Sequence, residues 1–302
     1  MKRSIFLLIL VVLLISACSS LAKSSVPTDS KMHILATETF LGDIAQNVAG
    51  GRIKIETLLP ATVDPHEFQP KPQDAVKITE SKMLIVNGLG YETWLAKTLE
   101  NVSGEQLIVV ATKGLTPNPD PSGEHPDGDP HMWMNPLNTI QYVKNIRDGL
   151  AQVDPAGKDT YTANEDAYIA KLKDLDQWVK AEVAQLPPEK RLLVTNHDAL
   201  GYFARAYDFK VVGAVIPSVT TESSPSAQQM ASLIDTIKSS SAPAIFLDIG
   251  ENQNLAKQIA SESGAKVITD LYVESISVSE GPAPTYIDMI KHDVSIIVDA
   301  LK

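Results

Sequence analysis

The feature that most restricts the fold is a long helical pattern in the middle of the chain, from Asp154 to Leu186. Its apolar residues recur at gaps of seven, four, three, four, four and three residues, which places them on one face of an α-helix. They are Tyr161, Tyr168, Leu172, Leu175, Val179, Val183 and Leu186. We expect Asp154 to cap this helix, Pro155 to occupy its first position and the Pro187-Pro188 pair to end it. A helix of about 30 residues is about 45 Å long, which is enough to cross a whole domain.

Short apolar runs alternate with helical patterns on both sides of this helix. The predicted strands are residues 33–36, 53–59, 83–86 and 106–110 before it, and 191–195, 210–216, 244–247 and 266–268 after it. The predicted helices are residues 41–48, 72–81, 94–99, 137–152, 199–207, 226–239, 252–263 and 285–301. Most of the strands are continuously apolar, as in parallel sheets that helices cover on both faces. The sequence therefore predicts an α/β protein with two parallel-sheet lobes, residues 32–153 and 189–302, joined by one long backbone helix at 154–188.

The N-terminus has the pattern of a targeting segment. Lys2 and Arg3 precede an apolar run at residues 5–15, which is too short to span a bilayer, because a spanning helix needs about 20 residues. Cys18 follows this run directly. An ordinary cleavage site with an incidental cysteine is one reading. The segment also resembles a bacterial lipoprotein signal, which implies a signal peptide at 1–17, a lipidated Cys18 and a polar tether up to residue 31.

Charge and cysteine content restrict the function. The formal net charge is −11, which argues against nucleic acid as a partner and suits a cationic ligand. Cys18 is the only cysteine of the sequence, so neither a disulfide within the chain nor a site of several thiolates can form.

Four potential metal ligands lie after predicted strands or, in the case of His131, just before the predicted helix at 137–152. His66 and His131 belong to the first lobe, and His197 and Asp270 to the second. Ligands of open α/β sheets bind beyond the carboxyl ends of the strands, so we expect the four side chains to face one cleft. Three imidazoles and one carboxylate form a four-coordinate site for a divalent transition metal. Their spacings of 65, 66 and 73 residues match no local motif, and each histidine alone could be a hydrogen-bonded structural residue.

The other histidines and carboxylates fit structural roles better. His33 opens a predicted strand, and His292 lies on the last helix. His125, in a proline-rich acidic segment at residues 116–130, could be an accessory residue that captures metal, or simply a solvated loop residue. Asp248 and Glu251 also lie at a strand end, and we expect them to support the ligands or to cap a helix.

Several longer motifs are more specific than these single residues. They are PHEFQP at 65–70, NGLGYE at 87–92 followed by Trp94, HMW at 131–133, HDALGYF at 197–203, and the segment from Asp270 to Tyr286 and Met289. With these motifs the chain resembles the substrate-binding proteins of metal ABC importers, the zinc- and manganese-binding cluster A-I (ZnuA/TroA-like) family. The resemblance covers residues 33–302.

The resemblance implies a rigid binding protein that holds metal between its lobes and delivers it to a membrane permease. It assigns ligand roles to His66, His131, His197 and Asp270. We therefore expect a monomer outside the cytoplasm, anchored to the membrane by its N-terminal lipid. A single long helix between the lobes should limit opening to the loops of the cleft.

The choice of metal depends on the third ligand. Manganese importers of this family tend to carry glutamate where this chain has His197, and three nitrogens with one oxygen suit tetrahedral zinc. Zinc-specific members often have a long histidine-rich loop, whereas residues 116–130 offer only His125. Zinc is the predicted substrate, with manganese or ferrous iron as the alternative.

Two other classes of function stay open at this point. A zinc hydrolase would keep an open coordination position for water, with Asp270 free to act as a base. The sequence lacks HExxH, GxSxG and Walker-type motifs, so we expect a protein that is not an enzyme. A surface adhesin would use the acidic segment at 116–130 for a partner.

Overall fold

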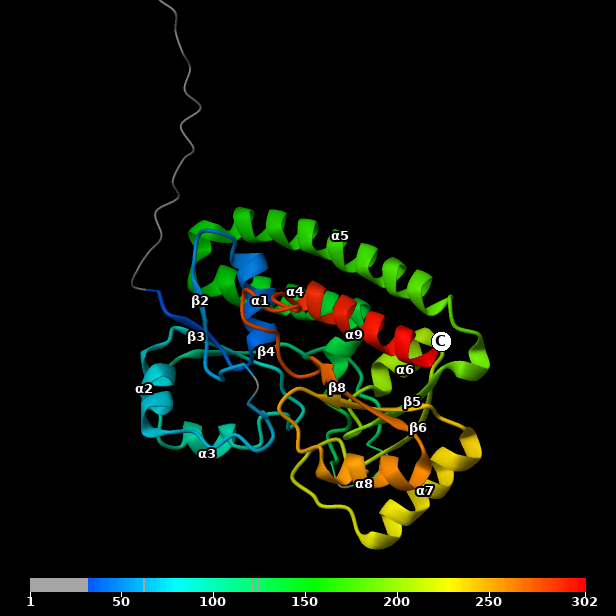
Figure 1. Cartoon of the computed structure of the whole chain (residues 1–302). Coiled ribbons are helices and arrows are strands. Elements are labelled where there is room, and N and C mark those ends of the chain that lie inside the picture. The colour runs from blue at the N-terminus through cyan, green and yellow to red at the C-terminus, as the bar shows by residue number, and fades with distance from the viewer. Residues whose placement is uncertain (1–31, 62, 121, 124) are drawn as a thin grey trace, which may run out of the picture.

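A computed structural model of the chain describes residues 32–61, 63–120, 122–123 and 125–302. It confirms the predicted α/β fold, with two parallel-sheet lobes and a long helix between them (Figure 1). The predicted signal peptide, the lipidated Cys18 and the tether at 18–31 lie outside the described residues. The lobe boundaries at 153–154 and 188–189 remain predictions.

The first lobe contains a parallel sheet in the order β2-β1-β3-β4. Its strands are β1 (Ile34–Ala36), β2 (Ile55–Thr57), β3 (Met83–Val86) and β4 (Leu107–Val110), and its helices are α1 (Thr39–Ala49), α2 (Pro72–Glu80), α3 (Leu95–Leu99) and α4 (Pro136–Val153). A short 3₁₀ turn, η1 (Met132–Met134), precedes α4. All four residues of β3 are buried, which agrees with its unbroken apolar sequence.

The second lobe repeats this arrangement with the sheet order β6-β5-β7-β8. Its strands are β5 (Leu192–Thr195), β6 (Lys210–Ala214), β7 (Ala244–Asp248) and β8 (Lys266–Leu271), and its helices are α6 (Gly201–Tyr207), α7 (Ala227–Ser240), α8 (Asn254–Ser263) and α9 (Tyr286–Leu301). The turns η2 (Pro155–Gly157) and η3 (Pro188–Lys190) flank the long helix. Within the described residues, no helix is both long and apolar enough to cross a membrane.

The long helix α5 (Lys158–Val183) runs along one side of the molecule and packs on α1, α4 and α9 (Figure 1). The predicted apolar stripe is buried, from Tyr161 to Leu186. At 26 residues α5 is about 39 Å long, shorter than expected because η2 occupies its predicted start. The expected side-chain cap by Asp154 is wrong: this carboxylate instead pairs with Arg52 and accepts a hydrogen bond from the Tyr161 hydroxyl.

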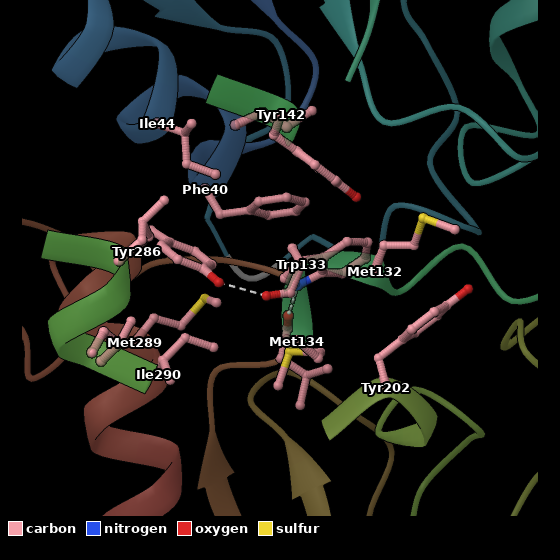
Figure 2. Close-up of a cluster of buried hydrophobic side chains, with 14 of the residues drawn as sticks. Phe40, Ile44, Met132, Trp133, Met134, Tyr142, Tyr202, Tyr286, Met289 and Ile290 are labelled. Carbon is pink, nitrogen blue, oxygen red and sulfur yellow. Dashed lines mark hydrogen bonds between the residues drawn. The ribbon is translucent and has the colours of Figure 1, made fainter. Parts of the chain in front are cut away.

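One hydrophobic core connects the lobes beneath α5. Figure 2 shows its centre, where Phe40 of α1 and Trp133 of η1 lie face to face, with ring centroids 4.4 Å apart. The hydroxyl of Tyr286, at the start of α9, donates a hydrogen bond to the Trp133 carbonyl at 2.6 Å (Figure 2). The Trp133 indole N–H donates to the Val273 carbonyl at 2.8 Å. Residues from both lobes thus fix the position of η1, and with it the segment that begins at His131.

Candidate metal centre

Four buried side chains from four loops meet between the lobes. His66 lies between β2 and α2, and His131 directly precedes η1. His197 follows β5, and Glu274 follows β8. Each loop leaves the carboxyl end of a strand or leads into the next helix, so two parallel sheets bring residues distant in sequence to one point. The structure thus brings together three of the four side chains that the strand-end argument named, His66, His131 and His197.

The four side chains are close enough to hold one ion. One nitrogen from each histidine and one oxygen of Glu274 all lie within 4.8 Å of one another. Glu274 Oε1 is 3.1 Å from His66 Nε2, 3.2 Å from His197 Nε2 and 3.6 Å from His131 Nε2. The His131 and His197 Nε2 atoms are 3.3 Å apart. This is the donor set of a four-coordinate transition-metal site.

All four side chains of the cluster are almost completely buried. The exposed fractions are 1% for His66, 0% for His131, 2% for His197 and 3% for Glu274. Within the described residues, neither His66 Nε2 nor Glu274 Oε1 has a hydrogen-bond partner of suitable geometry, although the two atoms are close. Buried polar atoms are rarely left unpaired in folded proteins. A cation coordinated by one atom of each of the four side chains would give both His66 Nε2 and Glu274 Oε1 a partner.

The predicted carboxylate was wrong. Asp270 lies within β8, which extends to Leu271 instead of ending at 268, and Asp270 is exposed to solvent. Its carbonyl oxygen is 2.9 Å from His292 Nε2, away from the three ligand histidines. Glu274 takes the expected place because the chain turns toward the cleft only after β8 ends. The signal that could have found it is the position of Glu274 just beyond the full strand.

The first lobe holds its imidazoles with a carboxylate and aromatic rings. Asp129 Oδ1 lies 2.8 Å from His131 Nδ1. The same oxygen accepts a hydrogen bond from the backbone N–H of His131 at 2.9 Å. A carboxylate on Nδ1 fixes the ring orientation and leaves Nε2 to face the metal. The edge of Tyr91 meets His66, with ring centroids 4.9 Å apart, and Trp133 packs beside His131 at 5.1 Å.

The second lobe holds its ligands through the backbone. The Asp248 carboxylate accepts the N–H groups of Val273 and Glu274 at 2.9 and 3.2 Å, which confirms the expectation that Asp248 supports a ligand. The Thr195 hydroxyl donates to the His197 carbonyl at 2.7 Å. Glu251 Oε1 stands 3.9 Å from His197 Nδ1, too far for a direct hydrogen bond.

The pKa values of the four residues are shifted by burial and by their interactions with one another, above all between Glu274 and the histidines. Burial favours the neutral form of Glu274, but His66 and His197 outweigh it and hold the pKa of Glu274 well below its usual range. Burial likewise lowers the pKa of His197, yet Glu274 and Glu251 raise it to about 9. Burial leaves the pKa of His66 below its usual value. Burial opposes protonation of His131 as well, but Asp129 and Glu274 raise the pKa of His131 above its usual value. A metal ion that binds here would therefore compete with protons for the imidazoles of His131 and His197.

The remaining histidines lie outside the cluster. His125 Nε2 is 3.4 Å from both Ser218 Oγ and Thr220 Oγ1, so the side chain rests against the second lobe. A role for His125 in capturing metal remains a prediction. His33 lies 3.9 Å from Glu56 at the edge of the first sheet.

A cavity of about 290 Å³ adjoins the cluster and reaches Glu274. Its lining includes Asp64, Glu67, Asp248 and Glu251 from both lobes. Burial raises the pKa of Asp248 well above its usual range and that of Glu251 to about 7, so part of this acidic lining is neutral near pH 7 and its negative charge grows with pH.

Comparison with known proteins agrees with this geometry. Residues 34–300 match the family described as zinc-uptake complex component A, periplasmic (ZnuA). The chain belongs to this family. It is 35% identical to the iron-binding protein YfeA of Yersinia pestis over 285 residues, which cover 94% of this chain and 91% of YfeA. It is 31% identical to the manganese-binding lipoprotein MntA of Halalkalibacterium halodurans over 296 residues, 98% of this chain and 97% of MntA.

Solved structures show the same fold. The periplasmic zinc-binding protein TroA of Treponema pallidum superposes with a TM-score of 0.84 at 28% identity, covering 90% of this chain and 99% of TroA. A manganese-bound mutant of the periplasmic metal-binding protein of Candidatus Liberibacter asiaticus gives 0.82 at 32% identity, covering 90% of this chain and 100% of the other.

Family membership sets the class of the protein. The family consists of substrate-binding components of metal ABC transporters, so this ZnuA-family chain is an extracytoplasmic solute-binding protein and not an enzyme, and several of its relatives are named lipoproteins. The resemblance predicted from its motifs is confirmed. The names of the relatives include manganese, iron and zinc, so membership alone leaves the metal open.

Proposed function

We propose that this chain captures Zn²⁺ between its two lobes and delivers it to the permease of an ABC importer. The observation that carries the proposal is the convergence of three imidazoles and the Glu274 carboxylate, all nearly inaccessible to water. Metal here is cargo, so the site must bind it tightly and yet release it at the membrane.

The donor set supports zinc over manganese. Zinc is commonly tetrahedral with nitrogen and oxygen donors, whereas manganese prefers more oxygen donors and higher coordination. His197 supplies a nitrogen at the third position, so the set contains three nitrogens and only one carboxylate. Two relatives are nevertheless named for manganese and iron, so selectivity needs a direct measurement.

A competition titration tests the proposal. The full chain, purified in mild detergent and stripped of metal, is titrated with Zn²⁺ and with Mn²⁺ against a chelating dye. We expect one zinc per chain, bound tightly enough that excess manganese does not displace it. Manganese binding at parity or better would overturn the zinc assignment, and no tight binding of either ion would overturn the four-ligand site.

Paired histidine variants show whether the ion binds at the cluster. His197→Ala removes one ligand nitrogen, whereas His292→Ala removes a half-buried imidazole that lies against the Asp270 carbonyl and the Tyr272 ring, outside the cluster. We expect zinc affinity to fall strongly in the first variant and to stay unchanged in the second. An equal loss in both would place the ion elsewhere.

We also propose that Cys18 carries the membrane anchor and that the anchored protein is a monomer. The apolar run at 5–15 directly before the single cysteine supports a lipoprotein signal, and several relatives are named lipoproteins. Cys18→Ser should move the protein from the membrane fraction to the soluble fraction. Unchanged membrane association would contradict lipidation at this residue, and light scattering of the wild type would test the monomer.

A further inference from the structure

Both backbone polar groups of His66 are held by side chains that also reach the opposite lobe. His66 has no hydrogen-bond partner on its ring nitrogens among the described residues, so its position depends on its backbone and on packing. The two supporting residues are Asp64 and Thr93, both of the first lobe. Their partners in the second lobe are Thr221 and Glu222, which follow one another in the segment between β6 and α7.

Asp64 uses its two carboxylate oxygens for two different lobes. Oδ1 accepts the backbone N–H of His66 at 2.8 Å, and Oδ2 accepts the hydroxyl of Thr221 at 2.6 Å. Thr221 is buried, with 8% of its surface exposed. A hydrogen bond to a carboxylate is short and stronger than one between neutral groups, and burial strengthens it further. One ionised side chain therefore connects a metal ligand to the second lobe.

Thr93 lies on the other side of His66, where its single hydroxyl proton can be donated to one of two acceptors at a time. Its hydroxyl lies 3.2 Å from the carbonyl oxygen of His66 and 3.0 Å from Glu222 Oε1. Both Thr93 and Glu222 are exposed, so water competes for this contact and we expect it to contribute less than the Asp64 contact.

The segment that contains Thr221 is itself bonded to the loop of His197. The N–H of Ile216 donates to the Asn196 carbonyl at 2.7 Å, and the N–H of Asp198 donates to the Ser218 carbonyl at 2.8 Å. A movement of this segment thus involves the ligand loop of the second lobe as well as the support of His66. The chain of contacts runs from one histidine ligand to another without passing through the metal.

We propose that Thr221, assisted by Glu222, is an interlobe latch that positions His66 and thereby sets the rate of metal release. This inference rests on the proposed function, because a release rate has meaning only if the site holds metal. When the latch is closed, Asp64 holds the His66 backbone in register with the other ligands. When the lobes part, the Thr221–Asp64 and Glu222–Thr93 contacts must break, since they join the residues that hold the His66 backbone to the second lobe.

The test replaces the hydroxyl and keeps the shape. Thr221→Val retains the β-branched side chain and removes the donor to Asp64. We expect zinc release, measured by stopped flow with excess chelating dye, to be about tenfold faster, as for loss of one hydrogen bond to a charged group. The rate of zinc binding should change less than about twofold, because changes at a contact of this kind affect mainly the dissociation rate.

Two further variants separate a latch from a general structural role. Thr221→Ser restores the hydroxyl and should return the release rate to within about twofold of the wild type. Thr236→Val, in α7 of the same lobe, removes a threonine hydroxyl that donates only to Ser232 of its own helix among the described residues, and should leave release unchanged. The melting temperature of the metal-free protein should be similar in all variants.

The outcomes distinguish this inference from the proposed function. If the wild type fails to bind zinc, the proposed function falls. If the wild type binds zinc but Thr221→Val releases it at the wild-type rate, only the latch is overturned. Faster release in Thr236→Val to the same degree, or no rescue by Thr221→Ser, would also overturn it. Should Thr221→Val fold poorly, Thr93→Val tests the weaker arm, with about twofold faster release expected and an unchanged rate as the contrary result.

Discussion

The two lobes contribute to the metal centre in different ways. The first lobe supplies two imidazoles, His66 and His131, set among aromatic rings of the shared core, with Asp129 directly on the ring of His131. The second lobe supplies one imidazole and the cluster's only carboxylate within the described residues, Glu274. No carboxylate there lies within hydrogen-bond distance of the His197 Nδ1 atom, since Glu251 stands at 3.9 Å.

The first lobe mainly fixes the geometry of the site, and the second lobe supplies its negative charge. The first lobe orients its nitrogens before metal arrives, because packing and a direct hydrogen bond fix them. In the proposed site the second lobe offsets part of the charge of the ion, because Glu274 is the carboxylate of the cluster and Asp248 holds the backbone of Glu274 in place. We therefore expect variants that alter the Glu274 charge to weaken metal binding more than variants that loosen a single ring.

The largest expected effect follows from neutralising the charge of the second lobe. Glu274→Gln keeps the size of the side chain but removes the negative charge and leaves buried imidazoles without it. Breaking a buried pair costs about 4 kcal/mol, which corresponds to a roughly thousandfold weaker zinc affinity. Competition with a chelating dye measures the loss. Asp270→Asn is the matched control, because Asp270 is an exposed residue of β8. An equal loss of zinc affinity in that variant would contradict the assignment of Glu274.

The second effect tests the geometry of the first lobe. Asp129→Asn removes the charge from the acceptor that orients His131, while the ligand nitrogens stay in place. Loss of such a supporting partner typically lowers metal affinity about 10- to 100-fold. Isothermal titration with zinc measures it, and Asp127→Asn, an exposed residue of the same loop, serves as control. An affinity equal to the wild type would mean that packing alone orients His131.

Much of this site could be predicted from sequence because strand ends constrain it. Three histidines spaced by 65 and 66 residues have no motif in common, but each adjoins a strand or helix boundary that periodicity reveals. The fourth ligand was missed because strand length is poorly marked in sequence: Thr269, Asp270 and Leu271 continue β8 although the apolar run ends at Ile268. An error of three residues at a strand end replaced Glu274 with Asp270.

The long helix shows a similar limit. Its apolar stripe predicted its buried face correctly, because burial follows the helical period. Its first turn was not predictable from local signals, since the Asp154 carboxylate pairs with Arg52, a residue 102 positions earlier in the chain. The supporting contacts of the metal ligands are of the same kind: Asp64 with Thr221, and Trp133 with Val273, depend on tertiary packing.

The third effect concerns pH. In the metal-free protein Glu274 raises the pKa of His197 to about 9 against the opposing effect of burial. Zinc requires the neutral imidazole, so apparent affinity should rise with pH up to about tenfold per unit until pH 9 and then level. The stability of the metal-free fold changes with pH in the opposite direction. Because the pKa of His197 is higher in the folded than in the unfolded protein, its protonation stabilises the fold fully below pH 6.5, the pKa in the unfolded chain. This stabilisation is lost as pH rises through 9. Calorimetry at pH 7.5 in buffers of different ionisation enthalpy should detect about one or more released protons, since the pKa of His131 is raised as well. Release of no proton would contradict these shifts.

The smallest effect sharpens the contrast between the lobes. Glu251 is the counterpart of Asp129, because it is the carboxylate nearest to Nδ1 of a ligand histidine, but its distance of 3.9 Å excludes a direct hydrogen bond. Glu251→Gln should therefore weaken zinc binding only about two- to threefold, through loss of a modest charge interaction with His197. The comparison with Asp129→Asn, measured by the same titration, is the informative quantity. If Glu251→Gln cost as much as Asp129→Asn, the second lobe would orient His197 as firmly as the first orients His131, and the division into a geometric lobe and a charged lobe would fail.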